Sequence, residues 1–583
     1  MNVSAVEPAA GRVADGKLIS SLAEERSPAN GPAFWIQRLE WLAALLVTVF
    51  AVAIHLRFVT NVGGLWRDET NSVNLATLSS LGEMWRSLEY DSFPILYFFV
   101  LRAWTGIFGA GNDAALRALG LIIGLGVLGV LWANARAFGA RLPVLSFALL
   151  GLNPMFIRYG DSNRAYGLGI VLLLLTLRSF WRLVEEPAAP TAKRVISASL
   201  CALLSVHCLY YNAVLLVAIA AGALAVAVRA RAWRTAGIIL GIGAFAAVTL
   251  LPYAPMMIRM REWTFLVSYP CDFPWLWSRA TDVMGSPIPE GVWLWTGLFF
   301  GGLLFVAGYA LWSFVSRHRR VVPARLPAPV LFAAITLGVG VAGYAGFLRL
   351  LNYYTQPWYY ITAAAFAACT LDIVFGAWPA AKNPRISIVL RCLRPVVALA
   401  LLSLAAQQAW KEMPIRHTNM DLVAARLQSL ATKEDLILIA HWEKAIPFSR
   451  YYHGAAEVVT LPPIEDHRFH RYDLMLAQMK TKDAHQPVLA RMEQVLRSGH
   501  RVFFAGEMSF PEPEEQLPVL PVAFRDDEGV WHGSRLNLLW HLHTGQFMRA
   551  HSTGVGRISV PVPNGGEVQH FEKVEVGVME GWR

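Results

Sequence analysis

The chain has 583 residues, of which 55% are hydrophobic and only 16% charged, and its formal net charge at pH 7 is +10. Soluble domains usually carry about 25% charged residues, so this composition excludes a purely soluble protein. The five cysteines are scattered and odd in number, which predicts neither a disulfide framework nor a zinc site. The basic residues are not gathered in one polar segment, so the positive surplus does not predict nucleic-acid binding.

The charge is unevenly distributed along the chain. The segment from Ile415 to Arg583 contains 18 basic residues, 21 acidic residues and 12 of the 15 histidines, whereas the rest of the chain contains 33 basic and 20 acidic residues. We therefore predict a disordered cytoplasmic arm over residues 1–34, a transmembrane domain over 35–414 and a water-soluble domain over 415–583. The arm lacks a short apolar core with a cleavage site, so it is not expected to be a signal peptide.

Apolar stretches long enough to cross a membrane recur through the second part. The predicted spans are Trp41–Phe58, Ala115–Trp132, Leu142–Ile157, Ala165–Leu183, Val195–Cys208, Ala213–Val228, Ala236–Met257, Val292–Val315, Pro327–Gly346, Trp358–Phe375 and Pro395–Ala409. The stretch 93–108 is short and contains Arg102, which predicts an amphipathic helix lying in the membrane interface. The expected fold class is an all-α polytopic membrane protein with about eleven transmembrane helices and a C-terminal soluble α/β domain.

With 93–108 lying flat, the loops on one side of the membrane are all basic. They contain Arg136, Arg141, Lys193, Arg194, Arg229, Arg231, Arg234, Arg317, Arg319, Arg320, Lys382, Arg385, Arg391 and Arg394. The positive-inside rule places these loops in the cytoplasm. The opposite loops, which contain most of the acidic residues, then lie outside together with the C-terminal domain. The basic surplus therefore reflects topology.

The C-terminal segment alternates short apolar strands with helices. We predict strands at Asp435–Ala440, Glu457–Leu461 and Arg501–Ala505, and helices at Asp421–Leu430 and Asp473–Met479. This pattern predicts a small α/β domain. Its histidines, including His541 and His543, form no recognisable site and are expected at the surface.

Catalytic residues are expected in the outer loop over residues 60–94. Asp68 and Glu69 are adjacent carboxylates just outside the first span, next to Trp66 and Arg67. Such a pair suits a site that deprotonates a hydroxyl or binds a cation, because neighbouring carboxylates split their pKa values and leave one competent as a base. The alternative for the Asp-Glu pair by itself is two solvated surface acids.

A second outer loop gathers Arg158, Asp161, Arg164 and Tyr166 at one membrane boundary. Arginines on the outer face run against the positive-inside trend and indicate a specific anion partner. A guanidinium at headgroup depth forms bidentate bonds to phosphate and suits a lipid-linked phosphate. The alternative is that these arginines reach toward lipid headgroups.

Two further outer segments contain candidate binding residues. His207 precedes a tyrosine pair, and the stretch 349–360 contains Arg349, Tyr354 and Gln356 among several aromatic rings. Rings beside an amide suit a sugar, but Trp and Tyr are also ordinary anchors at the membrane interface. The sequence has no spacing typical of metal ligands and no glycine-rich motif of nucleotide binding.

The ordered series of outer-face residues resembles the membrane glycosyltransferases of the C-type fold, over roughly Trp41–Phe375. The series is Asp68-Glu69, Asp91…Pro94…Tyr97, Arg117, and Arg164-x-Tyr166 after Asn153-Pro154. The similar branch contains the protein O-mannosyltransferases, the aminoarabinose lipid A transferase and the rhizobial lipid A galacturonosyltransferases. Where these enzymes often have His-Pro-Pro, this chain has Ser92-Phe93-Pro94, which leaves the donor and the acceptor open.

The resemblance implies an inverting hexosyl- or pentosyltransferase that uses a polyprenyl-phosphate sugar. The acceptor would be a lipid, glycan or protein at the outer face of a bacterial inner membrane, as in lipid A or cell-envelope glycan modification. The N-terminus would be cytoplasmic and the C-terminal domain periplasmic. Membrane lipids are expected as partners and nucleic acid is not. No cofactor is implied with certainty, and a divalent metal is left open.

The resemblance also implies roles for single residues. Asp68 would act as the general base or orient the acceptor hydroxyl, and Glu69 would support it. Asp91 and Asp161 would contact sugar or acceptor. The other substrate-binding residues would be Tyr166, Tyr354 and Gln356, and the phosphate-binding residues would be Arg164, Arg349 and His207.

Two other classes of function are weighed against this one. A transporter or flippase of a lipid-linked sugar would have ionisable residues at mid-bilayer depth and internal repeats. The acids of this sequence lie mainly in outer loops, and no repeat is evident. A membrane scaffold whose C-terminal domain binds a partner would leave the outer Arg and Asp clusters without a purpose.

Overall fold

The structure of the protein is a computed structural model. It describes residues 32–91, 93–186, 189–264, 266, 271–318, 325–378, 384–521 and 532–583. Most of the predicted arm, residues 1–31, lies outside the described residues. So do Ser92 and three of the predicted cytoplasmic basic residues, Arg319, Arg320 and Lys382.

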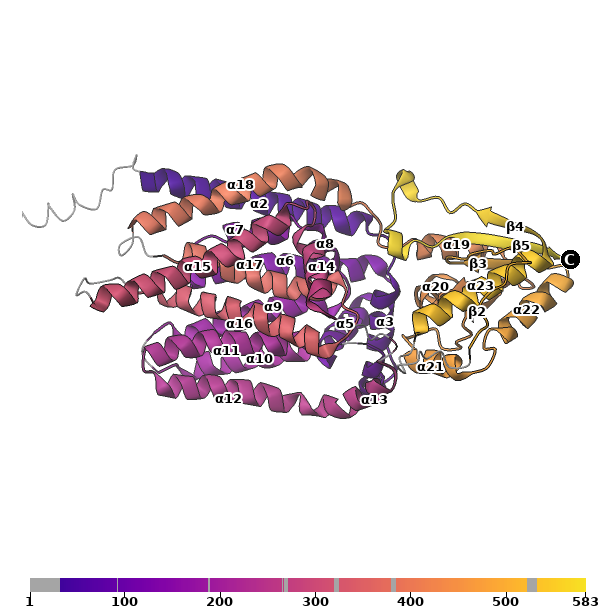
Figure 1. The fold of residues 1–583 in the computed structure, drawn as a ribbon, viewed down its shortest axis with the longest axis horizontal. Helices are drawn as coiled ribbons and strands as arrows, with labels where there is room; N and C mark the ends of the chain where they lie inside the picture. The colour runs from indigo at the N-terminus through magenta and orange to yellow at the C-terminus, as the bar shows by residue number, and fades with distance from the viewer. Residues whose placement is uncertain are drawn as a thin grey trace, which may run out of the picture.

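The membrane part is a bundle of long apolar helices (Figure 1). Nine spans among the described residues are long and apolar enough to cross a membrane. Their helices are α2 (Pro32–Asn61), α6 (Asp113–Ala137), α9 (Ala165–Val184), α11 (Tyr211–Arg229), α12 (Trp233–Thr249) continued by α13 (Ala254–Thr264), α15 (Gly291–His318), α16 (Ala328–Leu351), α17 (Ile361–Gly376) and α18 (Pro384–Glu412). These spans coincide with nine of the eleven predicted ones, which confirms the predicted class of polytopic helical protein.

The two remaining predicted spans are not among these nine. Residues 142–157 form two helices, α7 (Val144–Gly151) and α8 (Pro154–Gly160), because Pro154 cannot continue the ladder of α7 and its ring clashes with the preceding turn. The Asn153 side chain caps α8 by accepting from the Phe156 N–H at 3.1 Å. The other stretch forms α10 (Ala192–Cys208), whose 17 residues span about 26 Å at 1.5 Å per residue.

Short helices gather at the end of the bundle nearest the C-terminal domain. They are α3 (Arg67–Ala76), α4 (Leu81–Ser87), α5 (Ile95–Phe108) and α14 (Phe273–Met284). Helix α5 has 14 residues, or about 21 Å of length, so it is too short to cross a hydrocarbon core of about 30 Å. This length agrees with the prediction that 93–108 is not a span.

The C-terminal domain contains a five-stranded mixed sheet with the strand order β2-β1-β3-β5-β4. The strands are β1 (Leu436–Ala440), β2 (Glu457–Leu461), β3 (Val502–Ala505), β4 (Ser552–Ile558) and β5 (Val576–Trp582). Strands β2, β1 and β3 are parallel, and β5 runs antiparallel to both β3 and β4. The three predicted strands are therefore confirmed, as is the predicted α/β domain.

Helices cover both faces of this sheet. Side chains of β1 and β3 alternate between two apolar cores, with Leu436 and Leu438 in one and Ile437 and Ile439 in the other. The helices are α19 (Met420–Leu430), α20 (Ala445–Tyr451), α21 (Tyr472–Lys480), α22 (Gln486–Arg497) and α23 (Gly533–His551). Both faces of the central parallel strands are thus buried, which is why their sequences are continuously apolar.

Strands β4 and β5 were not predicted because glycines interrupt their apolar pattern. Gly554 and Gly556 lie in β4, and Gly577 and Gly581 lie in β5. At Gly577 a Cβ would collide with the ring of Phe504 on β3. The close packing of that ring on the neighbouring strand therefore requires glycine.

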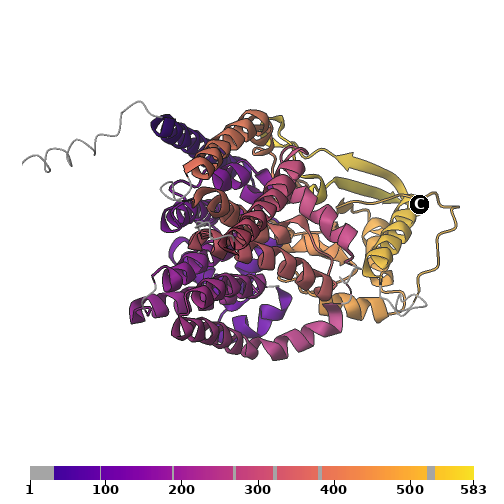
Figure 2. The same cartoon turned by 60° about the vertical axis from the view of Figure 1, so that its left-hand side comes forward.

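The C-terminal domain is attached to one end of the bundle by polar contacts (Figures 1 and 2). The Leu65 N–H donates to the hydroxyl of Tyr451 at 2.6 Å, and that hydroxyl donates to Asp113 at 2.6 Å. Arg450 also binds Asp113, at 2.5 Å. The His417 N–H donates to the Val62 carbonyl at 3.0 Å. These contacts place the domain directly over the loop that connects α2 to α3.

Candidate active site

Helix α3 begins with the two predicted acids in its first turn. Asp68 and Glu69 are favoured there because helix N-termini attract negative charge. Glu69 also accepts from the Trp66 N–H at 3.2 Å, which caps the helix that it belongs to. The two side chains leave the turn in different directions, and their surroundings differ accordingly.

Glu69 is completely buried and is used to hold the loop together. One carboxylate oxygen accepts from Arg117 at 2.5 Å and from the Asn163 N–H at 2.8 Å. Arg117 in turn donates to the carbonyl of Gly64 at 2.7 Å. Both oxygens of Glu69 therefore have partners inside the protein. The two acids do not face one site as expected, because Glu69 is fully buried and only Asp68 is partly exposed.

Asp68 is 17% exposed and surrounded by cationic groups. Its Oδ1 lies 3.3 Å from His470 Nε2 and 3.7 Å from Arg67 Nε, and its Oδ2 lies 4.0 Å from Arg164. Burial raises the pKa of Asp68, but His470, Arg164 and Arg67 lower it more, so the pKa lies well below its ordinary value. Asp68 is therefore a carboxylate at neutral pH.

Arg164 connects Asp68 to the second predicted acid, Asp91. It donates to the Asp91 carboxylate at 2.7 Å, to the Ser72 hydroxyl at 2.8 Å and to the Asp68 carbonyl at 3.0 Å. Asp91 also accepts from Asn71 at 3.0 Å. Although burial lowers the pKa of Arg164, the two aspartates raise it above its usual value. The predicted residues Asp68, Asp91 and Arg164 thus form one cluster.

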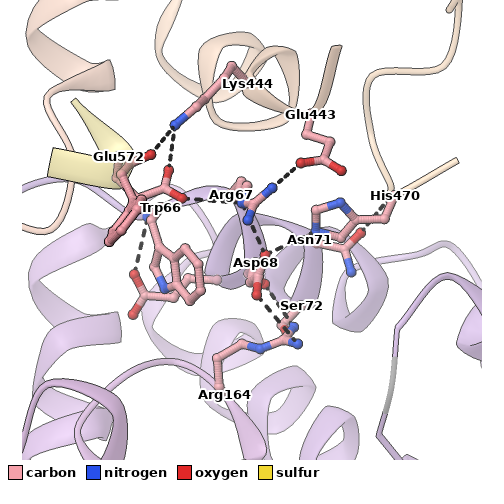
Figure 3. Close-up of polar contacts among 12 residues, drawn as sticks. Trp66, Arg67, Asp68, Asn71, Ser72, Arg164, Glu443, Lys444, His470 and Glu572 are labelled. Atoms are coloured by element: carbon pink, nitrogen blue, oxygen red, sulfur yellow. Dashed lines mark hydrogen bonds and ion pairs between the residues drawn. The ribbon is translucent and has the colours of Figure 1, made fainter. Parts of the chain in front are cut away.

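Arg67 is held by acids of the C-terminal domain, as Figure 3 shows. It forms ion pairs with Glu443, from the 3-10 helix η5 (Trp442–Lys444), and with Glu572, from η7 (His570–Glu572), the latter at 3.3 Å. Lys444 binds the other oxygen of Glu572 at 2.9 Å. Burial raises the pKa of Glu443, but Arg67 and His470 lower it below its ordinary value. Glu443 is therefore a carboxylate, and together with Glu572 it keeps Arg67 beside Asp68.

His470 enters the site from the C-terminal domain. Its backbone N–H donates to Asn71 at 3.1 Å, which places the imidazole opposite Asp68. The stacked ring of Tyr472 lies behind it, with centroids 6.0 Å apart. The prediction that the histidines of this segment are surface residues is wrong for His470, and also for His417, His485 and His541, all of which are buried.

Asp161 is not part of the cluster. Its carboxylate binds His55 of α2 at 2.6 Å, and both side chains are buried inside the bundle. Gly124 of α6 lies against this carboxylate, and a Cβ at that position would collide with it. The expectation that Asp161 contacts sugar or acceptor is therefore corrected, because loop packing turns its side chain toward α2 and α6.

The other predicted residues lie around the cluster or beyond it. Tyr166 is buried, with its ring edge-on to Phe93 at 5.1 Å between centroids. His207 binds the Tyr253 hydroxyl at 3.0 Å. Half-exposed Tyr354 packs against Trp275, and Gln356 is half-buried at the start of η4 (Pro357–Tyr360). None of the described contacts joins these side chains to Asp68.

Arg349 does not join Arg164 as a second phosphate ligand. It is exposed in the last turn of α16, and no ion pair of Arg349 is found among the described residues. Contact with lipid headgroups, the alternative given for the outer arginines, suits Arg349 better. Arg158, in contrast, is buried inside the protein. It donates to the carbonyls of Ile415 and Glu412 at 3.1 and 3.2 Å.

The sequence did not reveal Glu443, Lys444, His470 and Glu572. Glu443 and Lys444 follow β1 almost directly, after His441, whose φ of +65° marks a sharp change of direction. Loops after the carboxyl ends of parallel strands commonly carry binding residues, so this signal was available in the predicted strand. His470 lies in the loop after β2, another predicted parallel strand, and carried the same signal, whereas Glu572 lies in η7 before the antiparallel β5 and carried none.

The arrangement combines an ionised, partly exposed carboxylate with two arginines at the end of an apolar bundle. Asp68 can accept a hydrogen bond from a hydroxyl, and the guanidinium groups can stabilise a developing anion. The described residues contain no group of three His, Cys, Asp or Glu side chains placed to hold a metal ion. The acids of the site are instead paired with arginine or lysine.

No protein-family model and no curated protein sequence matches the chain. Among solved structures, ArnT from Cupriavidus metallidurans bound to undecaprenyl phosphate is 11% identical, with a TM-score of 0.45 over 80% of this chain and 93% of that one. The apo oligosaccharyltransferase of Archaeoglobus fulgidus is 11% identical, with a TM-score of 0.42 over 80% of this chain and 69% of that one. Archaeal AglB in complex with an inhibitory peptide and a dolichol-phosphate is 12% identical, with a TM-score of 0.43 over 81% and 69%. Similarity at this level assigns no activity.

Proposed function

We propose that the protein is a membrane glycosyltransferase that moves a sugar from a polyprenyl-phosphate donor to an acceptor hydroxyl. The reaction takes place at the outer face of a bacterial inner membrane. The observation that carries the proposal is the position of Asp68, an ionised and partly exposed carboxylate at the end of the bundle, between Arg164 and Arg67. The series of outer-face residues that resembles the C-type glycosyltransferases supports the same reaction.

The proposed step is a single displacement. The acceptor oxygen forms a bond to the anomeric carbon of the sugar, and the bond from that carbon to the phosphate oxygen breaks. The phosphate leaves with the electron pair, as the polyprenyl phosphate anion. Attack from the side opposite the leaving group inverts the anomeric centre, so one carboxylate on the acceptor side is sufficient.

Asp68 orients the acceptor hydroxyl and receives its proton as the bond to the sugar forms. The low pKa of Asp68 keeps it ionised, so it can accept the hydrogen bond of the hydroxyl. His470 Nε2 lies 3.3 Å from Asp68 Oδ1 and lowers the pKa of that carboxyl, so the imidazole holds the carboxylate in position.

Arg164 and Arg67 stabilise the charge on the departing phosphate. Arg164 is buried and held by Asp91, and Arg67 is held by Glu443 and Glu572, so neither guanidinium has to reorganise during the reaction. Preorganised cations of this kind are effective because they are already aimed at the charge that develops. Glu69 takes no part in the chemistry and braces α3.

The transporter alternative is supported less well. Buried ion pairs are present in the bundle, but His55 lies near the end of α2 that faces the site, and Asp372 lies near the opposite end of α17. A transporter would place such groups at the midplane. The scaffold alternative leaves the burial and pairing of Asp68, Asp91 and Arg164 unexplained.

The proposal is tested by product release. The purified full chain in nanodiscs is incubated with a panel of polyprenyl-phosphate sugars and acceptors, and free polyprenyl phosphate is measured by mass spectrometry. We expect Asp68→Asn to reduce turnover at least about 10³-fold while the protein stays folded, with a modest fall in Tm because the ionised carboxylate also contributes to stability. Glu83→Gln, an acid of α4 outside the site, should retain full turnover. Undiminished turnover in Asp68→Asn would disprove its assignment.

A further inference from the structure

A second charged cavity lies at the opposite end of the bundle from Asp68. Its volume is about 650 Å³, and it opens where α6, α9, α11 and α17 end and where α16 and α18 begin. This is the end of the bundle farthest from the C-terminal domain (Figure 1). It is also the end with the basic loops that the positive-inside rule places in the cytoplasm.

Five arginines line this cavity: Arg141, Arg229, Arg325, Arg391 and Arg394. Arg391 pairs with Glu40 at 2.6 Å, and Arg394 pairs with Asp372 at 2.9 Å. Glu185 is the one acid among the described lining residues. Five guanidinium groups thus face three carboxylates, which leaves a formal charge of +2 at a buried apolar boundary.

The uncompensated charge lies on three exposed arginines at the rim. Among the described residues, Arg141, Arg229 and Arg325 have no carboxylate partner, and Arg229 donates only to the Leu326 carbonyl, at 2.7 Å. Arginines that line one cavity without a carboxylate partner suit phosphate, since the N–H groups of a guanidinium match phosphate oxygens in pairs.

The remaining walls of the cavity are apolar. Phe138, Val184, Val226, Ala328 and Trp378 lie beside the arginines and face the space between the helices. A small hydrated anion gains nothing from such walls, whereas a lipid can place its headgroup among the arginines and its acyl chains along the apolar side. Basic pockets between transmembrane helices on the cytoplasmic side commonly bind anionic headgroups.

We propose that this cavity binds the phosphate of an anionic lipid from the cytoplasmic leaflet. The arginines of the rim hold the phosphate oxygens, and Arg391 and Arg394, which are anchored to Glu40 and Asp372, form the floor. Bound lipid then ties together α11, α16 and α18, which meet at the cavity. The site is independent of the proposed glycosyl transfer, because it lies at the other end of the bundle.

The test measures the stabilisation of the full chain in detergent by added lipid. Short-chain phosphatidylglycerol is compared with phosphatidylcholine and with inorganic phosphate, and the Tm is recorded at rising concentrations. The variant is Arg141→Gln with Arg325→Gln, and the matched control is Lys193→Gln with Arg385→Gln, two exposed basic residues of the same end that do not line the cavity. We expect phosphatidylglycerol to raise the Tm of the wild type and the control, and the variant to bind it about tenfold more weakly or worse.

Each result decides the proposal. Equal stabilisation of variant and wild type by phosphatidylglycerol, or no more stabilisation than phosphatidylcholine produces, would overturn it. Inorganic phosphate that stabilises as well as the lipid, and only when the arginines are present, would overturn the lipid as the source while retaining the phosphate site. If the double variant fails to fold, Arg325→Gln alone replaces it, because Arg325 precedes α16 and belongs to no helix.

Discussion

The ionisation of Asp68 depends on single neighbouring side chains. His470, Arg164 and Arg67 lower its pKa against the effect of burial, so Asp68 stays ionised from about pH 5 to pH 8. A depressed pKa in the folded state contributes stability at neutral pH, and this contribution is lost only as the pH falls through the depressed value. Protonation of Asp68 is therefore not expected to limit activity in this range.

Replacing His470 by glutamine tests whether it positions Asp68. His470 faces the Asp68 carboxylate at 3.3 Å and lowers the pKa of that group, so its loss should leave the carboxylate less well held. We expect His470→Gln to lower kcat about tenfold, measured as polyprenyl phosphate release. His453→Gln, an exposed histidine of the same domain, is the control. Turnover in His470→Gln equal to that of the wild type would contradict the assignment.

Among the elements, helix α3 positions Asp68, and Glu69 holds this helix in place. The same side chain caps α3, pairs with Arg117 of α6 and accepts from the N–H of Asn163, in the loop before α9. Arg164 follows directly in that loop and begins α9. One buried carboxylate thus sets the relative positions of Asp68 and Arg164, although it touches neither substrate.

Removing Glu69 should therefore damage the fold and the activity together. In Glu69→Ala, Arg117 remains buried without its carboxylate, and loss of one partner of a buried ion pair costs about 3–5 kcal/mol. We expect a lower Tm by differential scanning fluorimetry and loss of turnover. Asp68→Asn should also lose turnover but with a smaller fall in Tm, because Arg164 and Arg67 keep their other acid partners. A Glu69→Ala protein with the Tm of the wild type would show that Glu69 does not brace the loop.

At the scale of the whole molecule, the site is divided between two parts of the chain. The bundle supplies Asp68, Asp91 and Arg164, and the C-terminal domain supplies His470 together with the acids that hold Arg67. The two parts are joined by aromatic stacking, such as that of Phe469 on Tyr90, and by polar contacts, of which those of Tyr451 reach the loop that leads into α3. Activity is therefore expected to depend on docking of the C-terminal domain.

Loosening the docking should reduce activity without unfolding either part. Tyr451→Phe leaves the Leu65 N–H and the Asp113 carboxylate without the hydroxyl, at a cost of about 1–3 kcal/mol. We expect faster hydrogen exchange over residues 63–76 and about a tenfold loss of turnover. Tyr452→Phe is the matched control, since its hydroxyl accepts from the Ala456 N–H within the domain. Unchanged exchange in Tyr451→Phe would show that docking does not order α3.

Much of the architecture could be predicted because its causes are local. The nine spans and the parallel strands β1 and β3 are surrounded by lipid or by protein over their whole length, so each leaves a continuous apolar stretch in the sequence. The same reasoning failed at residues 142–157, where Pro154 breaks an apolar run into α7 and α8. It also failed at β4 and β5, where glycine is needed for close packing against neighbours such as Phe504.

The apolar spans followed from the amino-acid sequence, since hydropathy segregates along the chain, and the grouping of Asp68, Asp91 and Arg164 was expected from the resemblance of their motifs. The side of the membrane that the site faces stays a prediction. The direction of Asp161 toward His55, the burial of Glu69 and the isolation of Arg349 did not follow from the sequence. Arg67 and Glu443 are 376 positions apart, and their meeting depends on how the C-terminal domain docks. The local pattern of apolar residues determines which segments are buried, whereas the partner of a charged side chain depends on packing between distant segments.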